Sequence, residues 1–354
     1  MAPQLSIIVP VYNPGEYLPR ALGCIAAQTR GDFECILVDD GSTDGSAAVC
    51  DQWAAKDERF RVIHQKNAGA SAARNAGIEA ARAPWLLFAD ADDALAPDAA
   101  ETLLARQTAE PGTFVVFAFT EEWESLGKEQ RQPPEQRYRA RDFGRMYADT
   151  PLAAPWGKLF EAALVKQAGL RFDVTMRCYE DRPFVTDYLR AFFERAPEAE
   201  CLFINRPLYY YENDNAASLS KSDRSCLAPS HYEAFDRLLT DCLQRYGTPP
   251  EELTKIVMEY MNTLLYGAWC TPAKERRRAM ARFYKSGEYC RLMGFFKQNR
   301  LYEARYLPLR FHATALAVAL DQSRLAPPMA LYWKFHWLGL YTLCRGWTPL
   351  IPTG

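Results

Sequence analysis

The sequence lacks the short patterns that mark several common ligand sites. Its ten cysteines include no C-x-x-C pair and its four histidines show no zinc-ligand spacing, so neither a zinc site nor a disulfide framework is predicted. It has no G-x-x-x-x-G-K-[ST] loop and no G-x-G-x-x-G turn after its first apolar segment. The sequence therefore does not indicate a P-loop protein or a dinucleotide-binding protein. We interpret the cysteines as reduced, mostly buried thiols.

Long apolar runs and a leader peptide are also missing. The best candidate span, residues 325–344, is interrupted by Lys334 and His336 and falls short of the roughly 20 apolar residues that cross a bilayer. The N-terminus runs directly into the apolar segment Leu5–Val9, without a charged region or a cleavage site. We therefore expect a cytoplasmic chain without a transmembrane helix.

Charge of one sign does not dominate the chain. The net charge of −2 over 354 residues gives no basic footprint, so we expect no nucleic acid as a partner. The balance is uneven, however, because residues 1–220 hold 23 Lys and Arg against 33 Asp and Glu, whereas residues 221–354 hold 19 against 11. The two parts are predicted to face different partners, or each other.

The chain alternates short apolar runs rich in β-formers with helical segments, which predicts an α/β fold with a mostly parallel sheet. The predicted strands are residues 5–9, 33–38, 61–64, 85–89 and 114–119, and the predicted helices between them are 16–28, 43–55 and 70–81. Residues 121–150 are polar and contain two consecutive prolines, which predicts a long loop. After residue 221 the periodicity is helical, so we expect an α/β domain over 1–220 and a helical region over 221–354.

Polar residues follow four of the predicted strands. In an open parallel sheet, ligands bind beyond the carboxyl ends of the strands, so these residues should share one crevice. Asp90, Asp92 and Asp93 lie within four positions, and such a cluster of hard oxygen ligands suits Mg²⁺ or Mn²⁺ bound to phosphate. Capping of a helix by Asp92 or Asp93 is the alternative.

Residues at the ends of the first two predicted strands are suited to bind a nucleotide base. Tyr12 offers a flat face for a base, or it fills the core, and Asp40 can accept a hydrogen bond from the imide N–H of uracil. Asp39 and Asp40 also precede Gly41 and Ser42, which is the composition of an ordinary turn. Both interpretations stay open.

A second acidic pair precedes a helix that is expected to begin near Pro183. At about 100° per residue, Asp181 falls at the centre of the apolar stripe of that helix and Glu180 to one side. An inward acid at a helix start is either a simple N-cap or a general base whose pKa rises through desolvation. Glu180 is the better candidate for a supporting residue.

Taken together, these motifs resemble the family 2 glycosyltransferases of bacterial glycan assembly, over roughly residues 4–220. The motifs that carry the resemblance are 9–13 (V-P-V-Y-N), 37–44 (L-V-D-D-G-S-T-D), 67–75, 90–93 (D-A-D-D), 155–160 (P-W-G-K-L-F), 180–181 and 208–211. The resemblance implies a GT-A fold, with nucleotide-sugar binding in about residues 1–120 and the acceptor side in about 121–220. Members of the family often have Asn where Gly157 stands.

The resemblance also implies roles for single residues. Asp181 would be the catalytic base, and Glu180, Trp156 and Lys158 would support the site. Asp92 and Asp93 would hold Mn²⁺ or Mg²⁺ with the diphosphate of the donor. The remaining residues would bind the nucleotide: Pro10, Tyr12, Asp39, Asp40, Gly69, Arg74 and Asp90.

The implied activity is transfer of a sugar from a nucleoside diphosphate, a UDP-sugar by preference, to a hydroxyl of a glycan or lipid-linked acceptor, with inversion. The sugar class would be a hexose or N-acetylhexosamine, and the context surface polysaccharide synthesis. One rival is a non-catalytic nucleotide-sugar-binding subunit of a glycan-assembly complex. Another, a nucleotidyltransferase, would need a glycine-rich basic loop that residues 9–15 do not supply.

The basic C-terminal region has two interpretations. Residues 291–345 hold eight basic and two acidic residues, interleaved with aromatic side chains. Such a surface fits peripheral contact with the anionic inner face of a membrane, where a lipid-linked acceptor would lie. It equally fits a helical cover on the acidic domain, and residues 274–278 are predicted to be a solvated helix face.

Overall fold

The computed structural model describes residues 2–128, 133–176, 179–215, 229–269 and 273–299. The chain divides into two compact units, residues 1–256 and residues 257–354. Every strand in the described ranges belongs to the first unit.

The N-terminal part of the first unit is a parallel sheet with the order β3-β2-β1-β4. The strands are β1 (Leu5–Val11), β2 (Phe33–Asp39), β3 (Phe60–His64) and β4 (Trp85–Phe88), and the helices that connect them are α1 (Tyr17–Ala26), α2 (Ser46–Lys56) and α3 (Ala70–Ala80). β1 and β2 are buried almost throughout, which explains why both appear in the sequence as continuous apolar runs. The predicted order of elements is confirmed here.

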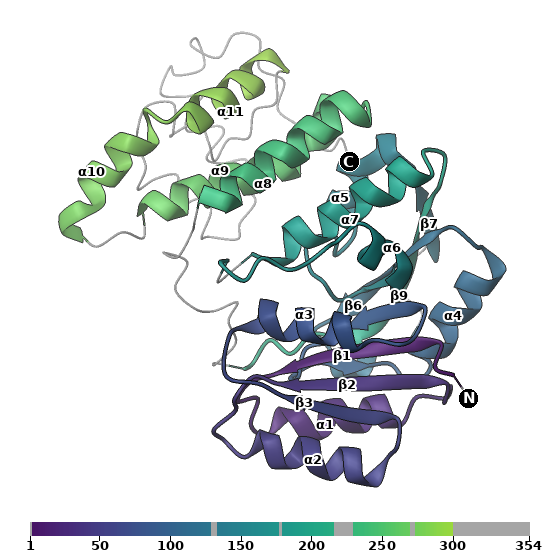
Figure 1. Ribbon diagram of the computed structural model, residues 1–354. Helices are drawn as coiled ribbons and strands as arrows, with labels where there is room; N and C mark the ends of the chain where they lie inside the picture. The colour runs from purple at the N-terminus through teal and green to yellow at the C-terminus, as the bar shows by residue number, and fades with distance from the viewer. Residues whose placement is uncertain (1, 129–132, 177–178, 216–228, 270–272, 300–354) are drawn as a thin grey trace. The chain divides into compact units, whose positions relative to one another are not determined.

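The helices lie on both faces of this sheet, with α3 on one side and α1 and α2 on the other (Figure 1). Gly77 is the reason why α3 packs so closely on β1. A Cβ atom at that position would lie 2.3 Å from Cγ2 of Ile8, a distance that no packed side chain tolerates. The close contact fixes the C-terminal half of α3 on the middle of β1.

The rest of the sheet mixes directions. β8 (Lys158–Glu161) runs antiparallel to β4 and to β6 (Phe114–Thr120), and β6 runs parallel to β9 (Cys201–Tyr210). Two short strands pair antiparallel with β9, β5 (Ala94–Leu95) near its end and β7 (Glu135–Tyr138) near its beginning. Because β6 and β9 point in the same direction as β1 and β4, their carboxyl ends lie at the same edge of the sheet.

The predicted long loop over residues 121–150 is wrong. This segment contains a 3₁₀ turn (Trp123–Ser125), β7, a second 3₁₀ turn (Ala140–Asp142) and helix α5 (Phe143–Asp149). β7 is stabilised by pairing with β9, and α5 buries Phe143, Met146 and Tyr147. Elements of four and seven residues are too short for periodicity to reveal them, since their stability comes from distant partners.

The two faces of the sheet are packed differently. Aliphatic side chains of the strands pack with α1, α2 and α4 (Ala99–Ala109) on one face. On the other face, aromatic rings pack with α7 (Asp181–Arg195), and the centroids of Phe172 and Phe184 are 4.0 Å apart in a stacked pair. Phe88 of β4 meets Phe184 edge to face, at 5.7 Å. This aromatic cluster fixes the N-terminal half of α7 on the sheet. Helix α6 (Ala162–Gln167) follows β8.

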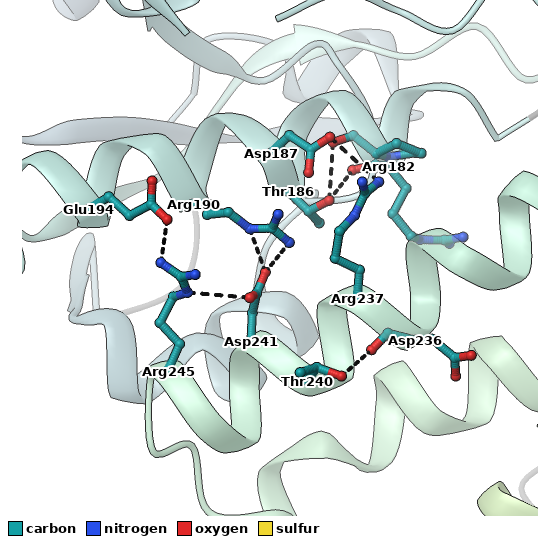
Figure 2. Close-up of polar contacts among 11 residues, drawn as sticks. Arg182, Thr186, Asp187, Arg190, Glu194, Asp236, Arg237, Thr240, Asp241 and Arg245 are labelled. Atoms are coloured by element: carbon teal, nitrogen blue, oxygen red, sulfur yellow. Dashed lines mark hydrogen bonds and ion pairs between the residues drawn. The ribbon is translucent and has the colours of Figure 1, made fainter.

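Helical elements from residue 229 onward also belong to the first unit, which ends at Ile256. They are α8 (Pro229–Thr240), a π-helical turn (Asp241–Arg245), a 3₁₀ turn (Pro250–Leu253) and the first residues of α9 (Thr254–Trp269). Ion pairs hold α8 and the π-helical turn on α7, as Figure 2 shows. Nε of Arg190 lies 2.8 Å from the Asp241 carboxylate, Arg245 pairs with Glu194, and Arg237 lies 3.6 Å from Asp187.

The second unit is described only over the remainder of α9, α10 (Ala273–Phe283) and α11 (Gly287–Gln298). Lys274, Arg277 and Arg278 are exposed, so the predicted solvated helix face is confirmed at these three positions. Most of the basic region 291–345 lies outside the described residues.

Substitution of Asp241 tests the ion pairs that hold the π-helical turn on α7. Asp241→Ala removes the partner of two arginines, and we expect it to lower the free energy of unfolding by about 1–2 kcal/mol. Urea denaturation of the full chain measures this change. Glu58→Ala, at an exposed position of the first unit, serves as the control, and an equal effect of both substitutions would contradict this role of the ion pairs.

Candidate active site

The ends of β1 and β2 are tied together by hydrogen bonds that leave Tyr12 exposed. Asn13 has a φ of +50°, and its Oδ1 accepts a hydrogen bond from the Thr43 N–H at 2.7 Å. The Gly15 N–H donates to the Asp44 carboxylate at 2.8 Å. Tyr12 is 54% exposed, so it does not fill the core, and its ring is available to a ligand.

Asp39 is buried at the end of β2 and bonded on both oxygens. Oδ1 accepts from the Ser42 N–H at 3.0 Å, and Oδ2 lies 2.9 Å from Nδ1 of His64. Burial raises the pKa of Asp39, but the bonds from His64 and Ser42 outweigh it and lower this pKa, so Asp39 is ionised. The same bond from Asp39, with one from Asp51, raises the pKa of His64, a residue that the sequence analysis missed.

Asp40 holds the loop that precedes α3. Its Oδ1 accepts from the Gln65 side chain at 2.7 Å and from the Ala68 N–H at 2.8 Å, and its Oδ2 accepts from the Gly69 N–H at 2.8 Å. Gly69 has a φ of +93°, which glycine adopts without strain. A carboxylate has about four acceptor positions, so three bonds leave one unfilled, on a residue that is 2% exposed.

Arg74 brings together three acids that are far apart in the sequence. The guanidinium is 5% exposed, and its Nη1 donates to Asp181 at 2.9 Å and to Glu180 at 3.0 Å, while Nη2 donates to Asp90 at 3.1 Å. Burial lowers the pKa of Arg74, but the charges of Asp181, Asp90 and Glu180 more than offset it and raise this pKa well above its usual range. Arg74 is thus a permanent cation directed at the acids, and its contact with a nucleotide stays a prediction.

Asp181 lies at the start of α7 with its side chain 26% exposed. Glu180 occupies the position before the helix, and the Asp181 carboxylate is bonded to Arg74, so the N-cap interpretation does not describe Asp181. Burial raises the pKa of Asp181 to about 7, with Arg74 and Lys158 opposing and Glu180 and Asp90 adding to the rise. A partly desolvated carboxyl with such a pKa is suited to proton transfer near neutral pH.

Asp93 points into the protein and anchors the end of β9. It is 2% exposed, its Oδ2 accepts from the Tyr209 hydroxyl at 2.6 Å, and its Oδ1 accepts from the Glu212 N–H at 2.8 Å. The Tyr209 oxygen in turn accepts from the Asp90 N–H at 3.0 Å. Burial, with the charges of Asp90 and Asp92, raises the pKa of Asp93 to about 9.

Asp92 is the more accessible of the two predicted metal ligands. Its Oδ2 accepts from the Asn215 amide at 2.8 Å, and its backbone oxygen accepts from Arg20 at 2.6 Å. Burial and the charge of Asp90 raise the pKa of Asp92. In the described part of the chain, no group of three or more His, Cys, Asp or Glu side chains is arranged to hold a metal by itself.

Lys158 is the first residue of β8, and Trp156 lies two residues before it. Lys158 is fully buried, and its Nζ donates to the carbonyls of Pro151 and Ala154 at 2.6 Å and of Trp156 at 2.9 Å. Burial lowers the pKa of Lys158 to about 7, but three N–H donors require the ammonium form, so these bonds favour the charged state. The Trp156 ring stacks on Tyr209 at 4.8 Å.

Gly157 stands where members of the family often have Asn. It has a φ of +76°, a conformation that glycine adopts freely and asparagine more readily than most residues. A Cβ atom at this position would lie 3.3 Å from the carbonyl oxygen of Phe117 and 3.3 Å from Cγ of Pro151, so an Asn here would require these neighbours to shift by a few tenths of an ångström.

Comparisons with known proteins identify sequences and structures similar to this chain. Residues 6–168 match the model of glycosyl transferase family 2. The chain carries a family 2 glycosyltransferase domain. It is similar to the putative glycosyltransferase EpsH of Bacillus subtilis, with 33% identity over 220 residues, which are 59% of this chain and 60% of that protein. The chain thus spans less than two thirds of the length of the first curated relatives that it matches.

Two solved structures share the fold of this chain. S. aureus TarS 1–349 in complex with UDP-GlcNAc has a TM-score of 0.59 and 17% identity, covering 83% of this chain and 92% of that chain. The mannosyltransferase PcManGT from Pyrobaculum calidifontis, in complex with GDP-Man and Mn²⁺, has a TM-score of 0.50 and 19% identity. The match covers 93% of this chain and 88% of that chain. At this identity the likeness is evidence for the fold alone, and the predicted GT-A fold is confirmed. Within the described residues no helix is long and apolar enough to cross a membrane.

Replacement of Lys158 tests how strongly this side chain stabilises the loop before β8. Lys158→Met leaves three buried carbonyls without their donor, and we expect it to lower the free energy of unfolding by about 2–4 kcal/mol. Urea denaturation measures the change. Lys166→Met is the matched control, because Lys166 is exposed and donates to the single carbonyl of Ala81 at 2.9 Å. Similar losses in the two variants would contradict the role assigned to Lys158.

Proposed function

We propose that this chain transfers a sugar from a nucleoside diphosphate donor to a hydroxyl of a growing glycan, with inversion at the anomeric carbon. The observation that carries the proposal is the position of Asp181. This carboxyl is partly exposed, has a raised pKa, and is held by Arg74 beside Asp90, at the sheet edge of a family 2 glycosyltransferase domain.

The donor would bind at the ends of β1 and β2. Exposed Tyr12 offers its ring to the base, Pro10 shapes the strand beside it, and Asp40 has one acceptor position left for an N–H of the base. Asp39 and Gly69 keep this end rigid, and Asp90 would accept from a ribose hydroxyl. The UDP-GlcNAc in the TarS structure supports uracil as the base, and the GDP-Man in PcManGT keeps guanine as the alternative.

A divalent cation, Mn²⁺ or Mg²⁺, fits the acidic end of β4. Asp92 would hold it, because its carboxyl is partly exposed, and because burial together with the charge of Asp90 raises its pKa, which a bound cation would counteract. Asp93 would act behind it as an anchor through Tyr209. When bound, the metal supplies positive charge that stabilises the departing diphosphate. The Mn²⁺ in PcManGT supports this cofactor.

Asp181 would be the catalytic base. Its carboxylate takes the proton of the acceptor hydroxyl, the oxygen forms a bond to the anomeric carbon, and the bond from that carbon to the diphosphate oxygen breaks. One displacement requires inversion and no covalent sugar intermediate. Arg74 would act as a positioning residue, since its bond to one oxygen of Asp181 fixes the direction of the other. Glu180 would support Arg74.

The acceptor is proposed to be a glycan or a lipid-linked glycan in surface polysaccharide synthesis. Peripheral contact with the cytoplasmic face of a membrane stays a prediction, because the basic residues concerned lie mostly outside the described part of the chain. A non-catalytic nucleotide-sugar-binding subunit would not need a base with a raised pKa, so the environment of Asp181 favours the enzyme.

The pH dependence of transfer tests the base. Asp181 faces Arg74, Glu180, Asp90 and Lys158, and its pKa of about 7 means that the carboxylate forms as the pH rises through 7. We therefore expect the transfer rate to rise with pH to a plateau, falling about tenfold per pH unit on the acid side. Asp181→Asn should lower kcat at least about a hundredfold and leave donor affinity unchanged.

Asp187→Asn is the matched control for that substitution, because Asp187 lies on the same helix with a side chain 31% exposed. It should retain both the rate and the pH profile. Near-normal transfer by Asp181→Asn would show that another group is the base.

The proposed function itself is tested by the donor. Thermal shift and donor hydrolysis would be measured for UDP-, GDP- and dTDP-sugars with and without Mn²⁺. We expect one nucleotide to stabilise the chain in a metal-dependent way, and Asp92→Ala to remove the metal dependence. If no nucleotide sugar changes the melting temperature, the proposal fails.

A further inference from the structure

A cavity of about 520 Å³ lies on the C-terminal part of the sheet, against β6, β7 and β9. Its lining also includes the end of α5 and Lys255, at the start of α9. No lining residue comes from β1 to β4 or from α1 to α3, the elements that form the proposed donor site. The cavity is thus a separate site, and its volume lies in the range of small-ligand pockets, roughly 300–1,000 Å³.

The polar residues that line the cavity have an unfilled hydrogen-bond acceptor position. The Tyr138 hydroxyl lies within hydrogen-bond distance of Oε1 of Gln136, at 2.9 Å, and of Oδ2 of Asp149, at 3.0 Å. A hydroxyl carries one hydrogen, so it can donate to only one of these two lining residues. The other keeps an unfilled acceptor position. Lys255 is exposed and donates to the carbonyls of Tyr147 and Ala148, at 3.3 and 3.1 Å, which leaves one N–H of its ammonium group.

The apolar part of the lining is flat and aromatic. Phe119 at the end of β6 is 37% exposed, although its ring contacts Trp156 at 5.0 Å. A pyranose ring has one face of C–H groups and a rim of hydroxyls that both donate and accept. An exposed aromatic ring beside an amide, a carboxylate and an ammonium group matches both features. Asp149 and Lys255 have opposite charges, so the lining favours a neutral sugar.

Residues that line the cavity are neighbours of residues that stabilise the proposed catalytic site. In the register of β6 and β9, Phe119 lies opposite Tyr209, whose hydroxyl binds Asp93. Pro151, another lining residue, gives its carbonyl to Lys158. A sugar held at Phe119 would therefore lie beside the strand whose Tyr209 fixes the acidic turn after β4.

We propose that this cavity is an acceptor subsite, which binds a neutral hexose or N-acetylhexosamine unit of the glycan at a distance from the hydroxyl that is glycosylated. The proposal rests on the proposed function, since it assigns the acceptor of that reaction. Its consequence is selectivity for length: a glycan long enough to reach the cavity binds more tightly than a single sugar glycoside.

Saturation-transfer NMR on the full chain tests the subsite. The probes are methyl glycosides and di- and trisaccharides of glucose, galactose, rhamnose and N-acetylglucosamine, each with excess UDP and Mn²⁺ present to fill the donor site. We expect at least one oligosaccharide to bind the wild type. Gln136→Ala and Phe119→Ala should each raise its Kd about tenfold.

Two controls separate the possible outcomes. Gln52→Ala, an exposed glutamine on α2, should bind as the wild type does, and Asp92→Ala should retain the saccharide. The subsite is overturned if no saccharide binds, or if Gln136→Ala and Gln52→Ala bind equally. In either case a UDP-dependent thermal shift would leave the proposed function standing, whereas its loss as well would overturn both.

Discussion

The buried guanidinium of Arg74 is the interaction on which the site depends. It joins α3, the end of β4 and the start of α7 through Asp90, Glu180 and Asp181. Three carboxyl groups this close would repel one another, and the cost of burying them would be high without a cation between them. Arg74 therefore allows acids to gather at one sheet edge, and it leaves Asp181 partly exposed toward that edge.

Two further buried contacts stabilise the surroundings of this centre. Tyr209 links Asp93 to the backbone of Asp90, so that the end of β9 and the acidic turn after β4 keep one relative position. Lys158 gathers three carbonyls and fixes the loop that carries Trp156. None of these side chains needs to touch a substrate. The contacts of Tyr209 fix the turn that carries Asp92, which would face the ligands in the proposed reaction.

The outer face of α7 is held as firmly as its start. Aromatic stacking fixes its inner side on the sheet, and arginine–carboxylate pairs hold α8 and the turn after it on its outer side. A helix held on both sides can present a base without moving when the acceptor binds, which lowers the cost of reaching the reactive geometry. The proposed acceptor subsite lies against β6, β7, β9 and the end of α5, so donor and acceptor would approach the acidic edge from different elements.

The sequence by itself determined the alternation of strands and helices, the acidic edge and the family, because each depends on local periodicity or on motifs a few residues long. It also singled out Arg74, Asp181 and Lys158, but not their partners. Only the tertiary structure decided that Arg74 turns to Asp181, 107 residues away, and that Asp93 turns inward to Tyr209, 116 residues away. The same holds for β7 and α5 and for the extension of the first unit to Ile256, since short elements and domain limits are fixed by contacts between distant segments, and these leave no period in the sequence.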